Sequence, residues 1–418
     1  MAARTVVIGI DGVSYGIIQE LSRKGDMPNF ASLKDEGNFS KMRSAVPEVS
    51  NVNWSSIVTG KNPGEHGVFG FTELIEGTYT ISFPDRRSLK ALPFWEDSSN
   101  RYVIINVPAM YPAPDINGIF VSGFVSLDLA RSVSPASALP FFEEIGYKID
   151  VDSSKAQESL KVFTKDLFET LKKREIVCNR YLKKNWDYFM LVFTGSDRLG
   201  HFLIDAYHHT DHEYHQVFLD YFREIDRIIG DIVMELKEGD RLVMISDHGM
   251  EPIKRNVNVN SLLEAEGYLQ LGDRPEQRYN NIKEKTKAFA LDPGRIYLNR
   301  TDRYPRGEVE SGEEVVDELV SLFKDLRFQG ERVIKKIHRK EGAYHGPHLN
   351  TAPDLILTPS SGYNLKGSVK YNSLFEQNIF KGKHTEHDAF LYCNDLALPK
   401  HPKVEDVRSI IQGDQHLR

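Results

Sequence analysis

The sequence predicts an α/β fold in which a largely parallel central sheet lies between helices. Three apolar runs lie at residues 5–10, 187–193 and 240–245. Apolar and polar residues do not alternate in them, as they would in a half-exposed strand, and such continuous runs are typical of strands covered on both faces. Segments with helical periodicity lie between such runs, most clearly at residues 155–184 and 213–236. Strands that alternate with helices indicate a parallel sheet.

Composition limits the classes of function. The chain has 418 residues, with 40% hydrophobic and 27% charged side chains, and no stretch is long and apolar enough to span a bilayer, so no membrane partner is expected. The net charge of -7 argues against binding of a nucleic-acid polymer, although a local site can still hold a small phosphorylated substrate. The oligomeric state stays open.

The N-terminal residues indicate a compartment, and the cysteine content limits the possible metal ligands. The first residues lack the basic flank and apolar stretch of a signal peptide, which predicts a cytoplasmic protein. Only Cys178 and Cys393 are present, so there is neither a disulfide framework nor a cysteine-based zinc site. Any metal must therefore be held by oxygen and imidazole ligands.

The first strand ends in Asp11-Gly12. The carboxyl ends of strands are where open α/β sheets place their ligands, and Gly12 lets the backbone turn close beside the carboxylate. On this dipeptide alone, an ordinary turn aspartate is the preferred interpretation. Further strands are expected at residues 102–107 and 118–123.

Ser50 is a candidate nucleophile. It precedes a short apolar segment that Gly60 ends, so it is expected at the start of a helix, where unpaired backbone N-H groups favour a phosphate. Because a bare hydroxyl is a poor nucleophile, the serine needs an activating base or metal. A simple cap is the alternative, and the nearby hydroxyls are expected to be caps or packing groups: Ser44, Ser55, Ser56 and Thr59.

Two further strand ends and a late segment offer metal ligands. Asp197 and His201 are four residues apart and share a face if the segment is helical, and Asp247-His248 directly follows a buried strand. His384 lies in a polar segment, residues 382–388, that is expected to be a loop. A capping aspartate and a chance histidine are the alternative for Asp197 and His201. His208, His212 and His215, with His209 beside them, are expected on one helical face at a wet rim, and a second metal site there is left open.

The chain is expected to be one α/β domain, residues 1–418, with a cap-like insertion at about residues 253–350. That segment is more mixed and more charged than its surroundings, and a strand is expected within it at residues 294–298. Residues 353–357 are expected to return the chain to the central sheet.

Taken as a set, six oxygen or nitrogen ligands and one serine could form two metal sites of three protein ligands each. With these motifs the sequence resembles the alkaline phosphatase superfamily, in particular the branch of type I phosphodiesterases and nucleotide pyrophosphatases with its predicted phosphohydrolase or phosphomutase relatives. The resemblance covers nearly the whole chain. It rests on Asp11-Gly12, Met27-Pro28-Asn29, Ser50, Thr59-Gly60, Pro63-Gly64-Glu65-His66-Gly67, Asn106-Val107-Pro108, Tyr111-Pro112, Ser196-Asp197, His201, Ser246-Asp247-His248-Gly249, Pro353-Asp354-Leu355 and Gly382-Lys383-His384.

The resemblance implies an alkaline-phosphatase-like fold and two divalent metal ions, zinc or alternatively manganese. One ion is assigned to Asp11, Ser50, Asp247 and His248, and the other to Asp197, His201 and His384. The implied mechanism is in-line attack by Ser50 and formation of a phosphoseryl intermediate. Asn53, or the backbone N-H of Asn51, is expected to donate a hydrogen bond to a phosphoryl oxygen.

We therefore expect a two-metal hydrolase of a small phosphodiester or nucleotide pyrophosphate. Two departures from the family pattern, the serine at position 50 and Phe69-Gly70-Phe71 where an asparagine is usual, also suit a phosphate monoesterase or phosphomutase. A sulfatase is disfavoured because no cysteine lies near Ser50. A relative that binds ligands without catalysis is the remote alternative, and its ligand binding would tolerate alanine at position 50.

Overall fold

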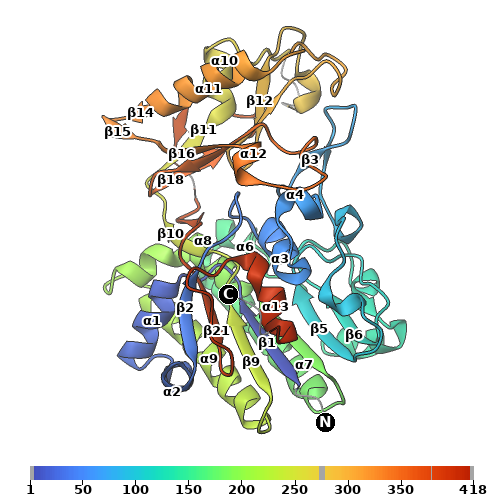
Figure 1. Cartoon of the computed structure of the whole chain (residues 1–418). Coiled ribbons are helices and arrows are strands. Elements are labelled where there is room, and N and C mark those ends of the chain that lie inside the picture. Colours follow the sequence, from blue (N-terminus) through green and yellow to red (C-terminus); the bar gives the residue numbers. More distant parts are fainter. Residues whose placement is uncertain (1–3, 273–277, 378, 415–418) are drawn as a thin grey trace. The chain divides into compact units, whose positions relative to one another are not determined.

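The computed structural model describes residues 4–272, 278–377 and 379–414 (Figure 1). Its contacts divide the chain into two compact units. The first comprises Met1–Lys61, Asp85–Pro252 and Ile379–Arg418, and the second comprises Asn62–Pro84 and Ile253–Asn378. The second unit thus extends beyond the insertion expected at 253–350, because it reaches Asn378 and takes in an earlier segment.

An eight-stranded sheet forms the centre of the first unit, in the order β2-β21-β9-β1-β8-β5-β6-β7. The five strands from β9 to β6 are parallel, as the apolar runs predict, and β1 lies between β8 and β9. The predicted α/β class is confirmed. The strand bounds are β1 (Thr5–Ile10), β2 (Asn38–Met42), β5 (Tyr102–Val107), β6 (Gly118–Ser122), β7 (Val133–Ser134), β8 (Tyr188–Phe193), β9 (Arg241–Ile245) and β21 (Ala389–Cys393).

The edges of this sheet are antiparallel and differ from the sequence prediction. β21 pairs with both β9 and β2, and β7 pairs with β6. The run at residues 353–357 does not return to this sheet. It forms β17 (Leu355–Pro359), which pairs within the second unit. A short apolar run that joins the central sheet looks the same in the sequence as one that joins another sheet, because contacts with residues distant along the chain decide its pairing partner.

Helices cover both faces of the central sheet. Val6, Ile8 and Ile10 share one apolar core with helices of one face, whereas Gly9 points to the opposite face, where a Cβ atom would lie 2.5 Å from the Trp54 ring. Figure 1 shows α3 and α13 over the sheet. The helices that share the apolar core with Val6, Ile8 and Ile10 are α1 (Tyr15–Lys24), α2 (Pro28–Glu36), α7 (Leu160–Leu182), α8 (Gly195–His208) and α9 (His215–Met234). The helices of the other face are α3 (Ser50–Thr59) and α13 (Val407–Gln412). Two shorter helices complete the unit: α5 (Leu139–Glu144) and α6 (Lys155–Glu158).

The second unit has its own apolar core and mostly antiparallel strands. One sheet has the order β12-β13-β17-β16, and another has the order β18-β11-β19. The strand predicted at residues 294–298 is confirmed as β13. The principal strands are β11 (Arg255–Asn258), β12 (Ala288–Leu291), β13 (Arg295–Leu298), β16 (Ile334–Arg339), β18 (Tyr363–Lys366) and β19 (Phe375–Glu376). The helices are α4 (Pro63–His66), α10 (Val259–Ala265), α11 (Glu313–Asp325) and α12 (Lys340–Ala343). Two short hairpins pair β3 (Glu73–Leu74) with β4 (Ile81–Ser82) and β14 (Arg327–Phe328) with β15 (Glu331–Arg332).

Among the residues that the structure describes, no helix has the length and apolar character that crossing a bilayer requires.

Candidate active site

Three neighbouring parallel strands bring the predicted ligands to one edge of the sheet. Asp11 follows β1, Asp197 and His201 lie in α8 directly after β8, and Asp247 and His248 follow β9. Because β9, β1 and β8 are adjacent and parallel, their carboxyl ends meet at the same edge. Residues almost 240 positions apart in the sequence, such as Asp11 and Asp247, thereby become neighbours: the backbone N-H of Gly12 donates to Asp247 Oδ1 at 3.1 Å.

His384 comes from a strand, not from the polar loop that the sequence predicts. It lies in β20 (Gly382–Thr385), which pairs antiparallel with β10 (Gly249–Pro252), so that Met250 is opposite His384. The strand was missed because its side chains are polar and only the pairing with β10, some 130 residues earlier, makes it extended. This pairing places His384 beside His248, with their rings stacked 3.6 Å apart.

Ser50 is the first residue of α3 and is only 3% exposed. Its hydroxyl donates to Asp11 Oδ1 at 3.3 Å, and its Oγ lies 3.2 Å from His248 Nε2. The other Asp11 oxygen accepts a 2.9 Å hydrogen bond from the indole N-H of Trp54, one turn further along the same helix. The helix thus supplies both the candidate nucleophile and a residue that orients the neighbouring carboxylate, a role of Trp54 that the sequence did not predict.

Asp197, His201 and His384 form a tight cluster. The Nε2 atoms of the two histidines are 2.9 Å apart, and each lies within 3.4 Å of Asp197 Oδ1. Their Nδ1 atoms face backbone carbonyl oxygens, of Gly382 at 2.8 Å and Glu48 at 2.7 Å, so each Nδ1 carries the proton. Two Nε2 lone pairs therefore face one another beside a carboxylate, an arrangement that a shared cation would stabilise.

A second group shares Asp197 with the first. The donor atoms of Asp11, Asp197 and His248 all lie within 4.8 Å of one another. Asp247 is adjacent, with Oδ2 3.3 Å from His248 Nε2. Within the described part of the chain, Asp247 Oδ2 and Asp197 Oδ1 are buried and accept no hydrogen bond. Buried acceptors without donors fit metal ligands, so the residues suit the two cations expected from the sequence.

Burial determines the protonation of this site. It raises the pKa of Asp247 to about 7, and burial together with Asp247 and Asp197 raises the pKa of Asp11. Burial alone would also raise the pKa of Asp197, but His201, His384 and Arg198 outweigh it and hold that pKa well below its usual value. Burial lowers the pKa of His201, and burial with the nearby His248 lowers the pKa of His384 to about 3. The neutral imidazole is the form that ligates a divalent cation, whereas Asp11 and Asp247 would have to release their protons when a cation binds.

Arg198 is a site residue that sequence reasoning missed. Its guanidinium donates to Asp197 Oδ2 at 2.9 Å and to Asp150 Oδ2 at 3.0 and 2.7 Å, and it stacks 4.2 Å from the centre of the Phe124 ring. It therefore occupies one oxygen of Asp197 and leaves the other facing the histidines. The available signal was an arginine directly after a candidate metal ligand, where a cation is otherwise unfavourable.

Asn53 lies near Ser50 in the sequence, but its observed contacts serve the backbone. The side chain is fully buried, its Oδ1 accepts from the N-H of Ala45 at 2.7 Å, and its Nδ2 donates to the carbonyl of Val49 at 3.0 Å. These bonds hold the turn that leads into α3. Because the amide carries a second N-H, the role of Asn53 as a donor to the phosphoryl group stays a prediction.

The histidine-rich segment does not form the single helical face expected from its spacing. α8 ends at His208 and α9 begins at His215, so His208, His212 and His215 do not share one helix. In the described residues, the groups of three ligands close enough to hold a metal are the two at the strand ends, and neither includes this segment.

A family of known proteins and several solved structures are similar to this chain. A model of the family "Type I phosphodiesterase / nucleotide pyrophosphatase" matches residues 5–386. The solved structures similar to this fold include phosphonoacetate hydrolase from Sinorhizobium meliloti 1021, at 15% identity and a TM-score of 0.65, covering 99% of this chain and 96% of that one. Murine and human ectonucleotide pyrophosphatase / phosphodiesterase 5 match at 12% and 11% identity, with TM-scores of 0.56 and 0.58, covering 100% of this chain and 96% of each of theirs.

Proposed function

The chain belongs to the type I phosphodiesterase / nucleotide pyrophosphatase family, and from this premise we propose that it hydrolyses a small phosphodiester or nucleotide pyrophosphate with Ser50 as the nucleophile. The observation that supports this proposal is the position of Ser50 Oγ. The atom is buried at the start of a helix and lies within 3.3 Å of both Asp11 Oδ1 and His248 Nε2. A serine that served only as a cap would need neither neighbour.

Two divalent cations, zinc or alternatively manganese, complete the proposed site. Asp11, Ser50, Asp247 and His248 would hold one, and Asp197, His201 and His384 would hold the other. When bound, such ions acidify a coordinated hydroxyl and offset the charge of phosphoryl oxygens. The oxygen and imidazole donors suit either metal.

The chain's own residues then carry out the displacement. Asp11 accepts the hydrogen bond of the Ser50 hydroxyl and so fixes the position of Oγ within the cluster. As the Ser50 hydroxyl releases its proton to solvent, Oγ forms a bond to phosphorus and the bond to the leaving oxygen breaks. The leaving oxygen takes up a proton from solvent, and water later hydrolyses the phosphoseryl ester. The backbone N-H of Asn51, at the start of α3, is suited to donate to a phosphoryl oxygen.

A phosphate monoesterase or phosphomutase is the second candidate. The sequence Phe69-Gly70-Phe71 lacks the asparagine usual in the diesterases, and serine is a suitable nucleophile for monoesters. In either case we expect a small phosphorylated substrate and no nucleic-acid polymer. We place the enzyme in the cytoplasm, because Cys178 and Cys393 are both free and buried, as is usual under reducing conditions.

Hydrolysis of bis-p-nitrophenyl phosphate and of p-nitrophenyl phosphate tests the proposal. Protein stripped of metal and reloaded with zinc or manganese should cleave the diester faster, and Ser50→Ala should lose at least about a thousandfold in kcat. Preference for the monoester would favour the second candidate. Equal rates in the wild type and Ser50→Ala would show that Ser50 is not the nucleophile.

A further inference from the structure

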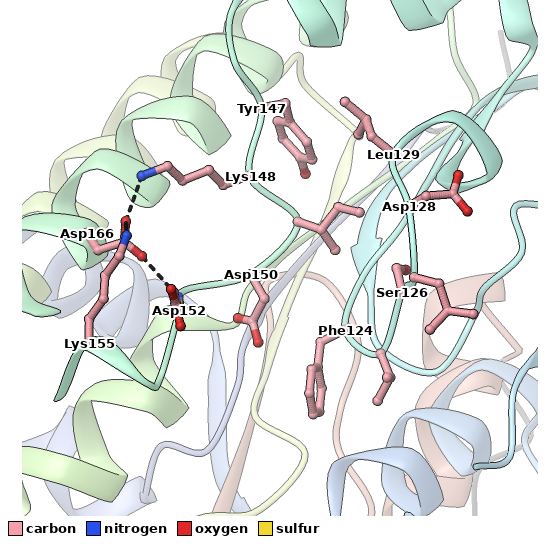
Figure 2. A pocket seen from close by; sticks show the side chains of 13 residues that line it. Phe124, Ser126, Asp128, Leu129, Tyr147, Lys148, Asp150, Asp152, Lys155 and Asp166 are labelled. Atoms are coloured by element: carbon pink, nitrogen blue, oxygen red, sulfur yellow. Dashed lines mark hydrogen bonds and ion pairs between the residues drawn. The ribbon is translucent and has the colours of Figure 1, made fainter. Parts of the chain in front are cut away.

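Two cavities of the chain differ in how their cationic residues are partnered. In the first unit, a cavity of ≈ 590 Å³ lies between residues 124–129 and 147–155 (Figure 2). Lys148 and Lys155 line this cavity, and both form ion pairs with Asp166, at 2.6 and 2.7 Å. An anion that entered would have to compete with Asp166 for the two lysines, so this larger cavity does not favour one.

A smaller cavity, of ≈ 240 Å³, lies in the second unit, and its cations have no acidic partner. Within the part of the chain that the structure describes, neither Lys254 nor Arg255 forms an ion pair, and the buried Nε atom of Arg255 has no hydrogen-bond partner. A buried donor without an acceptor is unfavourable unless water or a ligand supplies one. These groups therefore favour an anion. The lining consists of Lys254, Arg255, Phe328, Gln329, Glu331 and Tyr363.

Backbone hydrogen bonds and close packing hold the two cationic residues in place. The N-H groups of Lys254 and Arg255 both donate to the carbonyl oxygen of Gly362, at 2.7 and 3.1 Å. Gly362 has a φ of 82°, and a Cβ atom there would lie 2.6 Å from Lys254 Cγ, so glycine leaves room for the lysine stem. The guanidinium of Arg255 lies over the Phe328 ring, 5.0 Å from its centre. A ligand would therefore have to order little of the site when it binds.

The hairpin of β14 and β15 supplies three of the lining residues. Phe328 packs on Phe375 of β19, with ring centres 4.5 Å apart, which fixes the hairpin against that strand. Gln329, in the hairpin loop, adds a carboxamide that can donate a hydrogen bond. Glu331 is the one acidic residue of the lining, and its Oε2 accepts a hydrogen bond from the Tyr363 hydroxyl at 3.1 Å. The lining thus carries two positive charges and one negative charge.

We propose that this cavity binds a phosphate group, either as the free ion or as part of a small phosphorylated molecule. The cavity is smaller than most sites for drug-sized ligands, about 300–1,000 Å³, and suits a small ion. Arginine binds phosphate through two parallel N-H bonds, and the unpaired Nε of Arg255 is suited to supply one of them. Because Lys254 adds a second charge, a doubly charged anion fits the cavity better than a carboxylate with one charge. This binding does not depend on the hydrolysis proposed for Ser50.

Titration calorimetry of the full-length, metal-free protein with inorganic phosphate tests this inference. Without metal, the buried carboxyl groups near Ser50 disfavour an anion there, so binding reports on the second unit. The wild type should bind phosphate with a Kd of about 1 mM or below. Arg255→Gln should weaken binding at least about tenfold, because a charge-assisted pair of hydrogen bonds is lost. Lys254→Gln should also weaken it, and since Lys254 is exposed, this variant tests the site without disturbing the core.

Lys336→Gln is the matched control, because Lys336 is an exposed lysine of β16 in the same unit but does not line the cavity. This variant should bind phosphate as the wild type does. Acetate is the control ligand, and it should bind the wild type at least about tenfold more weakly than phosphate, since it has one charge. Methyl phosphate distinguishes the source of the group: binding as tight as that of inorganic phosphate indicates a phosphorylated molecule, and much weaker binding indicates the free ion.

The variants decide whether phosphate binds in this cavity. Weaker binding in Arg255→Gln and Lys254→Gln, with wild-type binding in Lys336→Gln, would support the site. A wild type that does not bind phosphate, an equal loss in all three variants, or acetate binding as tight as that of phosphate would overturn it.

Discussion

Both carboxylate oxygens of Asp197 have close neighbours in the site. Arg198 binds its Oδ2, while its Oδ1 faces the Nε2 atoms of His201 and His384. Because Asp150 also binds the arginine, the guanidinium has a fixed orientation between two carboxylates. A carboxylate fixed in this way meets a cation without first losing rotational freedom, and such supporting contacts strengthen metal binding.

Replacement of Arg198 should therefore weaken metal binding. We expect Arg198→Gln to raise the dissociation constant for zinc about 10- to 100-fold, with a smaller effect for Arg198→Lys, which keeps the charge but not the forked geometry. Titration calorimetry of the metal-free protein measures this. An unchanged affinity in Arg198→Gln would contradict the role, and Arg227→Gln, on the surface of α9, is the control.

His66 gives a prediction on pH. It is fully buried, its Nδ1 accepts from the N-H of Val68 at 3.2 Å, and burial lowers its pKa to about 3. The unfolded chain takes up this proton near pH 6.5, so between these values the unfolded state binds more protons. Stability from this residue is thus complete above about pH 6.5 and falls by about 1.4 kcal/mol per pH unit on acidification.

His66→Asn removes the titrating group while its Oδ1 can still accept from Val68. The free energy of unfolding, measured with urea at pH 4.5, 5.5 and 6.5, should depend on pH less steeply in the variant by about one proton. Identical slopes would contradict a buried neutral imidazole.

At the scale of elements, the contact between α3 and β1 positions the nucleophile. Trp54 packs on Gly9 and hydrogen-bonds Asp11, so one helix residue joins the strand to the carboxylate at its end. A methyl group at Gly9 would lie 2.5 Å from the Trp54 ring. The helix would have to shift, and Ser50 would shift with it.

Gly9→Ala should lower the free energy of unfolding by about 1–3 kcal/mol and should also reduce kcat. The matched control is Gly16→Ala in α1, where nothing lies within 4 Å of the added methyl group and alanine favours the helix. That variant should be as stable as the wild type or slightly more stable. Urea unfolding and diester turnover measure both effects, and a Gly9→Ala protein equal to the wild type would refute the packing argument.

The elements that the sequence predicted are those with local signals. The apolar runs of β1, β8 and β9 and the apolar stripe of α9 are visible in the local sequence. Gly60 ends α3 with a φ of 66°, as its position in the sequence predicted. β20 and β21 were not predicted, because their pairing partners lie more than 100 residues away. Trp54 was missed as a site residue for the same reason, because Asp11 becomes its neighbour only in the fold, and the contact of Arg198 with Asp150 is likewise formed between residues distant in the sequence.

At the scale of the molecule, the site places three buried carboxyl groups and three imidazoles at one end of the central sheet. Removing the cations should therefore destabilise the first unit, because mutual repulsion and burial of the carboxyl groups would be uncompensated. We expect chelation to lower the midpoint of thermal unfolding by several degrees and added zinc to restore it in a concentration-dependent way.

Differential scanning fluorimetry with and without chelator makes this measurement. Asp197→Asn with His384→Ala is the control, and its response to metal should be smaller than that of the wild type, because the ligands assigned to the other ion remain. A midpoint that is insensitive to metal in the wild type would contradict the assignment of these residues as ligands.

The central claim is that Ser50 forms a covalent bond to phosphorus. The most direct test is acid quenching of the metal-loaded enzyme during turnover of 4-nitrophenyl methyl phosphate, followed by mass spectrometry of the peptide that contains Ser50. We predict a methyl phosphoryl adduct on Ser50 that requires metal and is absent from Ser50→Ala. Full turnover in Ser50→Ala, with no adduct on the wild-type peptide, would contradict the account.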